Sequence, residues 1–244
     1  MRIIDAHVHV GCNKETKYYS EAELWRDLRE ANAQGAVIFA FPEDIYRVRD
    51  SKEARLEANE YVLQLSKKYP DLYPFYFVWT DYLIPENIGE YKGVKWHRHY
   101  NEPRYDYEDP KCREFIEVIK EFGMPVLLEE EFMETKNFVE SNPEVNVIIP
   151  HMGELNGGYE RMHIFYHKEN VYFDTSVAPL KVIREVLERV GPERVIFGSD
   201  VSGTSEPFYN FPKVELQKLY RLNLDEEDLE LILAGNIERI IAKG

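Results

Sequence analysis

Short apolar runs alternate with longer amphipathic segments from one end of the chain to the other. Most of the apolar runs are rich in Val, Ile, Phe and Tyr and lack clean polar alternation, which is typical of strands covered on both faces. We predict strands at Ile3–His9, Ala36–Phe41, Tyr73–Trp79, Gly93–His97, Pro125–Glu129, Val145–Pro150, Val171–Thr175 and Val195–Gly198.

The amphipathic segments between these runs predict helices. The first, Ser20–Ala33, opens with a capping-box pattern, Ser20 followed three residues later by Glu23. The connection Asp81–Tyr91 predicts only one helical turn, and the tail Leu224–Ala242 predicts two short helices after the last strand. The remaining helices are predicted at Ser51–Tyr69, Asp109–Phe122, Phe132–Glu140, Tyr159–His167, Leu180–Val190 and Lys213–Tyr220.

Strands that alternate with helices imply a parallel sheet with right-handed crossovers. Two α/β architectures fit this order, a closed (β/α)8 barrel and an open doubly wound sheet. No Gly-rich phosphate loop follows the first strand, so a dinucleotide-binding fold gains no support. The 244 residues are close to the length of one complete barrel, roughly 250 residues, and no linker or internal repeat divides them.

Charge and composition exclude several classes of partner. The chain has 30 Lys and Arg against 45 Asp and Glu, a net charge of −15, which argues against non-specific binding to nucleic acid or anionic membranes. No apolar stretch approaches the roughly 20 residues that span a bilayer, and no signal-peptide pattern precedes the first strand. Cys12 and Cys112 form no metal-type repeat and suit a reducing cytosol. We expect a cytoplasmic protein with a small-molecule substrate, and a homo-oligomer stays open.

The segment Asp5-Ala6-His7-Val8-His9 places candidate metal ligands on the first strand. Residues two apart on a strand share a face, so we expect Asp5, His7 and His9 to align on one side. Two imidazoles at the end of a buried strand can hold one divalent metal ion. An isolated His-x-His is more often a hydrogen-bonded polar pair, so this pattern needs support from elsewhere in the chain.

Two later strands end in residues of the same kind, because His151 follows the sixth strand and Asp200 follows the eighth. Active sites of (β/α)8 barrels lie at the carboxyl ends of the strands. The first and last strands become neighbours only if the sheet closes, so a metal shared by His7, His9 and Asp200 selects the barrel. We therefore expect a (β/α)8 TIM barrel, a single domain over residues 1–244, with an extra C-terminal helix.

Together these motifs resemble the amidohydrolase superfamily, and within it the amidohydrolase-2 group of metal-dependent barrel hydrolases and decarboxylases. The resemblance covers nearly the whole chain and rests on the order and spacing of its pieces. They are Ile4-Asp5-Ala6-His7-Val8-His9, Gly93-Val94-Lys95, Pro150-His151-Met152-Gly153, Tyr172-Phe173-Asp174-Thr175-Ser176, Val195-Ile196-Phe197-Gly198-Ser199-Asp200 and Ile232-Leu233-Ala234-Gly235-Asn236. The resemblance implies His7 and His9 as metal ligands, Asp200 as ligand and proton acceptor, and His151 as ligand or acid–base residue.

Strand five departs from the resemblance. The group usually ends this strand in Pro-Val-x-x-His, whereas this chain reads Pro125-Val126-Leu127-Leu128-Glu129. Some members of the superfamily bridge two metals with a carboxylate here, so Glu129 counts among the candidate metal ligands. Its negative charge shifts the expected metal from zinc toward manganese or a second ion. Glu130 or Glu131 could face the site instead, and a surface acidic run is the alternative.

Four further residues are candidates for substrate binding. Lys95 and His97 share one face of the fourth strand and could bind a carboxylate or phosphate if that face points inward. Arg98 is a third candidate, although we expect Arg98 and His99 to lie in a solvated loop. Asp174 ends the seventh strand, where it either orients a metal ligand or caps a helix.

Three functions are consistent with these residues. The first is a metal-dependent hydrolase of an amide, lactone or ester. In such an enzyme a divalent metal lowers the pKa of its bound water to about 7, and Asp200 would accept the proton of that water. His151 or the metal would polarise the carbonyl group. The second function is a non-oxidative decarboxylase, a lyase of a small carboxylic acid with the same ligands, and the third is a non-catalytic metal-binding barrel. We expect the hydrolase, with one or two ions, zinc before manganese.

Overall fold

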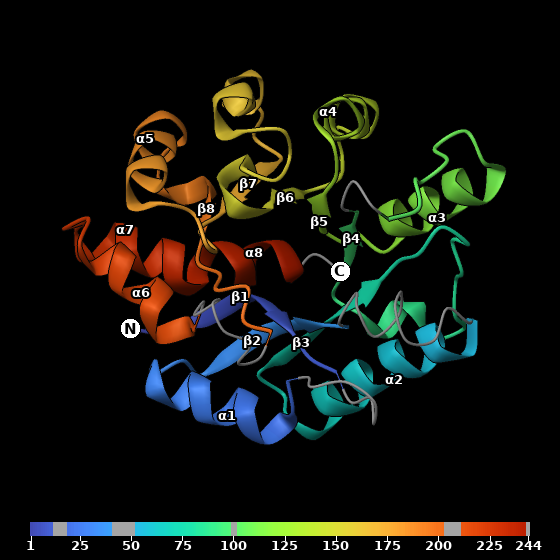
Figure 1. Ribbon diagram of the computed structural model, residues 1–244, viewed down its shortest axis with the longest axis horizontal. Coiled ribbons are helices and arrows are strands. Elements are labelled where there is room, and N and C mark those ends of the chain that lie inside the picture. The colour runs from blue at the N-terminus through green and yellow to red at the C-terminus, as the bar shows by residue number, and fades with distance from the viewer. Residues whose placement is uncertain (12–18, 41–51, 99–101, 203–210, 243–244) are drawn as a thin grey trace.

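The computed structural model describes residues 1–11, 19–40, 52–98, 102–202 and 211–242. Eight parallel strands follow one another in chain order round the sheet, as the sequence predicts for a (β/α)8 barrel, and helices surround them (Figure 1). The strands are β1 (Ile4–His9), β2 (Gly35–Phe39), β3 (Leu72–Phe77), β4 (Gly93–His97), β5 (Val126–Glu129), β6 (Val147–Ile149), β7 (Val171–Asp174) and β8 (Val195–Ile196). Cys12, Phe41, Ser51 and His99 lie outside the described residues.

Most helices lie where the sequence predicts them, and the capping box at Ser20 and Glu23 is present. The α-helices are α1 (Glu21–Glu30), α2 (Lys52–Lys68), α3 (Pro110–Glu121), α4 (Phe132–Ser141), α5 (Leu180–Val190), α6 (Pro212–Tyr220), α7 (Glu226–Glu230) and α8 (Asn236–Ile241). One predicted helix differs, because Tyr159–Phe165 is a 3-10 helix that begins after a glycine with positive φ and without a capping side chain. The third connection holds a single 3-10 turn, Ile88–Glu90.

The two ends of the sheet meet between β1 and the segment that follows β8. The Ala6 N–H donates to the Phe197 carbonyl at 2.9 Å, and the Asp200 N–H donates to the His7 carbonyl at 2.8 Å. A parallel bridge between Val8 and Val201 continues this contact. Asp200 is therefore held beside His7 by main-chain hydrogen bonds, which is the closure that a shared metal site requires.

A bulge in β1 changes which side chains share a face of the strand, so the predicted alignment of Asp5 with His7 and His9 is wrong. The pairing of β1 with β2 shifts register between Asp5 and Val8. Before the shift, Ile4 and Ala6 belong to the apolar cluster inside the barrel, whereas Val8 belongs to the cluster between strands and helices. Asp5 therefore does not share a face with His7 and His9, because one extra residue reverses the side on which later residues point.

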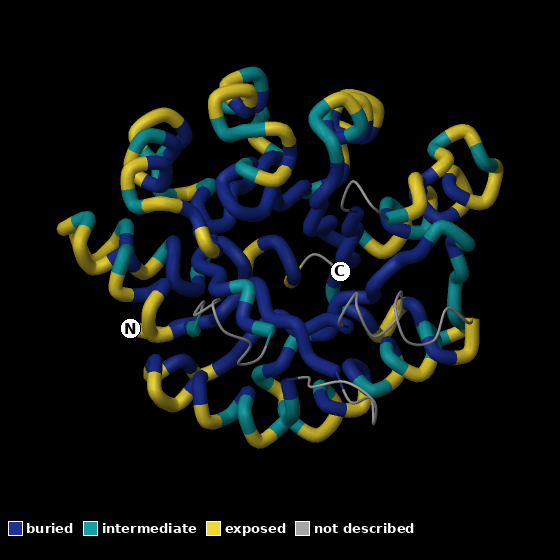
Figure 2. Tube along the Cα trace, viewed as in Figure 1, coloured by how far each residue is buried: buried dark blue, intermediate teal, exposed yellow. Residues whose placement is uncertain are grey.

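Two apolar layers hold the barrel together, and Figure 2 shows buried strands within a ring of partly exposed helices. The inner cluster takes residues from every strand except β4, and Ile237, Ile240 and Ile241 near the C-terminus pack against it. On β4 the fully buried Lys95 points inward, with its ammonium 5.1 Å from the centre of the Phe39 ring. None of the helices in the described ranges has the length and apolar composition needed to cross a membrane.

Candidate metal centre

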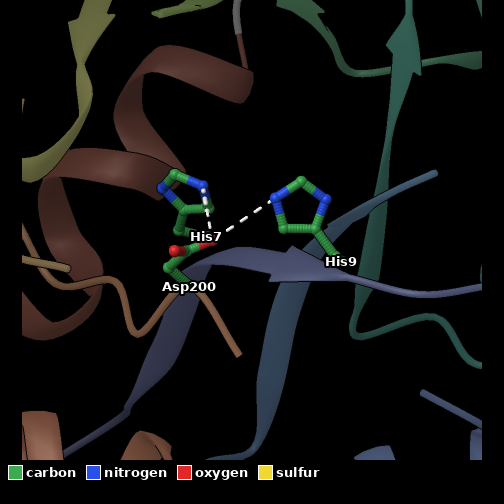
Figure 3. A group of neighbouring side chains, drawn as sticks. All are labelled: His7, His9 and Asp200. Carbon is green, nitrogen blue, oxygen red and sulfur yellow. Dashed lines mark ion pairs between the residues drawn. The ribbon is translucent and has the colours of Figure 1, made fainter. Parts of the chain in front are cut away.

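His7, His9 and Asp200 meet at the carboxyl end of the barrel (Figure 3). Asp200 Oδ1 lies 3.3 Å from His7 Nε2 and 3.3 Å from His9 Nε2. His7 is fully buried, whereas the Asp200 side chain keeps 26% of its surface exposed. Ligand atoms of the three residues all lie within 4.8 Å of one another, so one ion can contact all of them.

A second group of candidate ligands shares His7 with the first. His7, Glu129 and His151 also offer ligand atoms within 4.8 Å of one another. His151 Nε2 lies 3.7 Å from Glu129 Oε2, and both side chains are almost completely buried. The structure therefore brings together all five residues that the sequence names as candidate ligands, and of the three consecutive glutamates it is Glu129 that faces this group.

Main-chain carbonyl oxygens bind the Nδ1 atoms of His9 and His151 and so orient both rings. His9 Nδ1 lies 3.1 Å from the Ala40 carbonyl oxygen, and His151 Nδ1 lies 3.0 Å from the Ser176 carbonyl oxygen. A carbonyl oxygen can only accept, so Nδ1 is the donor in each ring, and Nε2 is the atom that faces the carboxylates, Asp200 for His9 and Glu129 for His151. Metal-binding histidines usually have such an Nδ1 partner. The donor set of this site therefore fits a divalent ion.

Asp174 provides the corresponding partner for His7. Its Oδ2 lies 2.6 Å from His7 Nδ1, and both side chains are fully buried. The other oxygen, Oδ1, accepts the Ser176 N–H at 2.7 Å and also binds the Ser176 hydroxyl. Asp174 does not cap α5, because Pro179 occupies that position. With both oxygens bound in this way, Asp174 orients His7.

A second buried carboxylate, Asp5, ties β1 to the residue before Asp200. Asp5 Oδ1 accepts the Ser199 N–H at 2.9 Å, and Asp5 Oδ2 accepts the Ser199 hydroxyl at 2.6 Å. Burial raises the pKa of Asp5 to about 7. The neighbouring Gly198 leaves the room that this arrangement needs, because a Cβ there would lie 2.9 Å from His7 Cβ.

We expect Ser199→Ala to destabilise the protein by about 1–3 kcal/mol, since it removes the hydroxyl donor to the fully buried Asp5. The measurement is the free energy of unfolding from urea titration. Ser66→Ala on α2 is the control, because that half-buried hydroxyl binds only a carbonyl of its own helix. A loss at Ser199 no larger than the loss at Ser66 would contradict this role.

Lys95 compensates the unusual charge at the end of strand five. Its ammonium lies 3.1 Å from Glu129 Oε2 and 3.3 Å from His7 Nε2, and the Lys95 side chain is fully buried. His97, on the same face of β4, places Nε2 3.6 Å from Glu129 Oε1 and Nδ1 3.2 Å from Glu102 Oε2. The face of Lys95 and His97 therefore points into the site, and Glu129 is surrounded by basic groups.

The expectation that Arg98 lies in a solvated loop is wrong. Its side chain is only 3% exposed, and its guanidinium lies 3.3 Å from Glu130 Oε1 and 2.8 Å from Glu131 Oε1. Glu130 is buried with it, whereas the Glu131 side chain is 44% exposed, so only the last residue of the acidic run Glu129–Glu131 reaches the surface. The charge of Arg98 is therefore matched by these two carboxylates rather than by the ligand cluster.

The pKa values of the ligand cluster reflect burial and close charges. Burial opposes the ionisation of Asp200, but its interactions with the imidazoles of His7, His9 and His151 outweigh burial and lower the Asp200 pKa. Burial and the Lys95 ammonium lower the pKa of His7 to about 4. Burial also lowers the pKa of His151, but hydrogen bonding to Glu129 and the nearby carboxylates raise it to about 9. An ionised Asp200 beside a neutral His7 suits metal coordination.

Sequence reasoning assigned no role to Ser176 or Ser199. Ser176 Oγ lies 3.2 Å from His7 Nδ1 and 3.0 Å from His151 Nδ1, so it joins two candidate ligands. Ser176 ends the motif Tyr172–Ser176, and Ser199 lies inside the motif Val195–Asp200. Their place in these motifs is the only signal in the sequence that points to them. Their roles depend on contacts between β1, β7 and the end of β8.

Comparisons with known proteins agree with the barrel fold. A model of the family described as amidohydrolase matches residues 4–242. Among curated proteins the sequence finds no relative. Solved structures with a similar fold include 5-carboxyvanillate decarboxylase from Sphingomonas paucimobilis, with 13% identity, a TM-score of 0.70 and 99% of both chains covered.

Two other similar structures carry different reactions in their names. A probable 2-pyrone-4,6-dicarboxylic acid hydrolase from Acinetobacter baumannii has 16% identity and a TM-score of 0.73, with 99% of this chain and 100% of that chain covered. The 4-oxalomesaconate hydratase from Rhodopseudomonas palustris has 15% identity and a TM-score of 0.69, with 99% and 96% covered. At these identities the likeness shows the barrel fold, and each reaction is that of the other protein.

Proposed function

The chain belongs to the amidohydrolase family, and on that premise we propose that it is a metal-dependent hydrolase of a small molecule with an amide, lactone or ester bond. The observation that carries this proposal is that two groups of candidate ligands share His7 at the carboxyl end of the barrel. One is His7, His9 and Asp200 and the other is His7, Glu129 and His151, and within each group the ligand atoms lie within 4.8 Å of one another. We assign His7, His9, His151 and Asp200 as the metal ligands. Zinc is the expected ion, because three nitrogen donors and one oxygen donor suit it.

A divalent ion held by these residues supplies Lewis acidity, which polarises a carbonyl group and makes water acidic enough to ionise near neutral pH. Asp200 is the proton acceptor in the proposed reaction. Its pKa is lowered, so it is ionised at neutral pH, and its side chain is the ligand with the largest exposed fraction. It takes the proton from the attacking water and returns it to the leaving group.

Lys95 provides positive charge beside the proposed metal ligands, because its ammonium lies 3.3 Å from His7 Nε2 and 3.1 Å from Glu129 Oε2. A carbonyl oxygen that gains negative charge during the reaction is stabilised by fixed positive groups of this kind. His97 and Lys95 on β4 are the proposed contacts of the substrate, and Asp174 acts through His7.

We propose that the site binds one ion. The second group of candidate ligands, His7, Glu129 and His151, already contains the buried Lys95 ammonium, 3.1 Å from Glu129 Oε2. A second divalent ion there would stand close to this ammonium, and charges of the same sign about 4 Å apart repel by roughly 4 kcal/mol per pair of unit charges at an effective dielectric near 20. Glu129 therefore balances Lys95 and is not needed as a ligand.

Metal content tests this stoichiometry. We expect one equivalent of zinc in the wild-type protein and in the double variant Lys95→Met/Glu129→Gln, with affinities within about tenfold because the net charge of the pair is unchanged. The measurements are elemental analysis after dialysis and calorimetric titration of the metal-free protein. Two equivalents in the wild type, or loss of binding in the double variant, would show that Glu129 holds metal.

The test of the reaction is a substrate screen on protein stripped of metal and then restored with Zn²⁺ or Mn²⁺. Amides, lactones and esters of small acids are the first set, and incorporation of ¹⁸O from labelled water identifies hydrolysis. Activity is expected only after a metal is restored. A protein that holds no metal and turns over none of these compounds would instead fit a non-catalytic barrel.

A second candidate function is non-oxidative decarboxylation of a small carboxylic acid. The observation that favours it is the Lys95 ammonium beside His7, since a cation at this position could bind a substrate carboxylate. Hydrolysis is preferred because Arg98, the other cation that could bind a substrate carboxylate, pairs with Glu130 and Glu131. Release of CO2 without incorporation of oxygen from water would establish the decarboxylase.

A further inference from the structure

Val177, in the loop between β7 and α5, has an unusual backbone. Its φ is 58°, in the left-handed region, although its side chain is branched at Cβ. Such a residue is an outlier there, because the branched side chain crowds its own main chain. The residue is 47% exposed, so little apolar burial compensates for this strain. Strained backbone that the surrounding structure maintains is often found beside functional groups.

The strained turn directs one carbonyl group toward a metal ligand. The Ala178 N–H donates to the Ser176 carbonyl at 2.6 Å, which closes a three-residue turn round Val177. The same carbonyl oxygen lies 3.0 Å from His151 Nδ1 and accepts a hydrogen bond from its N–H. The turn at Val177 therefore fixes the acceptor that determines the orientation of the His151 ring.

Two side chains of α6 hold the turn from outside the barrel. Glu215 Oε2 accepts the Val177 N–H at 3.1 Å, and Lys218 Nζ donates to the Ala178 carbonyl at 3.1 Å. Lys218 also binds Glu215 Oε2 at 2.7 Å, and the Glu215 side chain is only 4% exposed. A buried carboxylate that accepts a loop N–H is a rigid support, because its charge is matched by a lysine on the next turn of the same helix.

We propose that the left-handed turn at Val177, clamped by Glu215 and Lys218 of α6, positions His151 in the metal centre. Val177, Glu215 and Lys218 are positioning residues that act through the Ser176 carbonyl. The inference rests on the proposed function, because it takes His151 as a metal ligand. It adds a support that extends from α6, outside the strands, to a ligand inside the barrel.

Two pairs of variants test the clamp. Glu215→Ala removes the acceptor for the Val177 N–H, whereas Glu215→Gln retains a carbonyl oxygen there. Val177→Pro cannot adopt positive φ and has no N–H, whereas Val177→Gly adopts positive φ without strain. We expect Glu215→Ala and Val177→Pro to weaken Zn²⁺ binding by about tenfold or more, the range seen when partners of metal-binding histidines are lost, and the conservative variants to stay within about twofold.

The second readout is the visible absorption spectrum of the protein loaded with Co²⁺, which reports ligand geometry directly. It should change in Glu215→Ala and Val177→Pro and match the wild type in the conservative variants. Asn59→Ala is the matched control, because Asn59 is a buried α2 side chain that binds the Phe77 main chain on β3, a strand without candidate ligands. It should lower the melting temperature and leave both metal readouts unchanged.

Wild-type affinity and spectrum in Glu215→Ala and Val177→Pro would overturn the inference and leave the proposed function standing. Failure of the wild-type protein to bind Zn²⁺ or Co²⁺ would overturn both. Should Val177→Pro not fold, Glu215→Ala against Glu215→Gln decides alone, because both variants keep the main chain of the loop unaltered. Equal metal binding in that pair would contradict the clamp.

Discussion

Replacing Asp200 by asparagine will remove the hydrolytic activity and leave the fold intact. The amide retains an oxygen that can approach His7 and His9, which lie 3.3 Å from the carboxylate, but it cannot accept a proton. We expect kcat/KM to fall by at least about 1000-fold, within the range that general acid–base catalysis contributes. The measurement is steady-state kinetics on the best substrate of the screen, with zinc content determined for the same samples.

Asp27→Asn is the control for Asp200. Asp27 is a buried carboxylate on α1 that accepts the Tyr19 hydroxyl at 2.8 Å, so its loss removes a comparable side-chain charge outside the ligand cluster. It should alter stability but not kcat/KM. An Asp200→Asn protein that keeps its zinc and more than about a tenth of the wild-type activity would exclude Asp200 as the proton acceptor.

Replacing His7 by alanine will abolish the stabilisation that metal gives to the fold. His7 belongs to both groups of candidate ligands, so its loss damages the site more than the loss of any residue found in only one. At a free zinc concentration of 100 times Kd, binding stabilises the folded protein by about 2.7 kcal/mol. For a chain of 244 residues this corresponds to a rise in melting temperature of roughly 5–10 °C, which His7→Ala should not show.

The measurement for His7 is thermal unfolding with and without zinc, followed by circular dichroism. His163→Ala is the control, because His163 is exposed on the 3-10 helix Tyr159–Phe165 and should keep the full rise. A His7→Ala protein with a zinc-dependent rise equal to that of the wild type would show that the stabilising ion binds elsewhere.

The barrel could be predicted because its determinants are local. Each buried strand is an apolar run of its own, the first helix opens with a capping box at Ser20 and Glu23, and the ligand motifs stand at strand ends. The bulge between Asp5 and Val8 could not be predicted in this way, since it depends on how β1 pairs with β2 and with the segment after β8. Periodicity alone therefore placed Asp5 on the wrong face.

Contacts between distant segments explain the other differences. The sequence has Glu129 where the family it resembles usually has a histidine. Only the structure shows that the Lys95 ammonium lies 3.1 Å from Glu129 Oε2 and matches its charge. The sequence places Arg98 in a solvated loop. In the structure its guanidinium is buried against Glu130, a contact that no local pattern indicates. Glu215 gives no local signal at all, because its partner Val177 lies 38 residues away in the chain.

The most direct test of the metal centre is anomalous diffraction at the zinc absorption edge from crystals of the zinc-loaded protein. We predict one peak, within bonding distance of His7 Nε2, His9 Nε2 and Asp200 Oδ1, with His151 completing the site. A peak elsewhere, or none beside the His7 and His9 pair in protein that contains zinc, would contradict the assignment of these residues as the metal ligands.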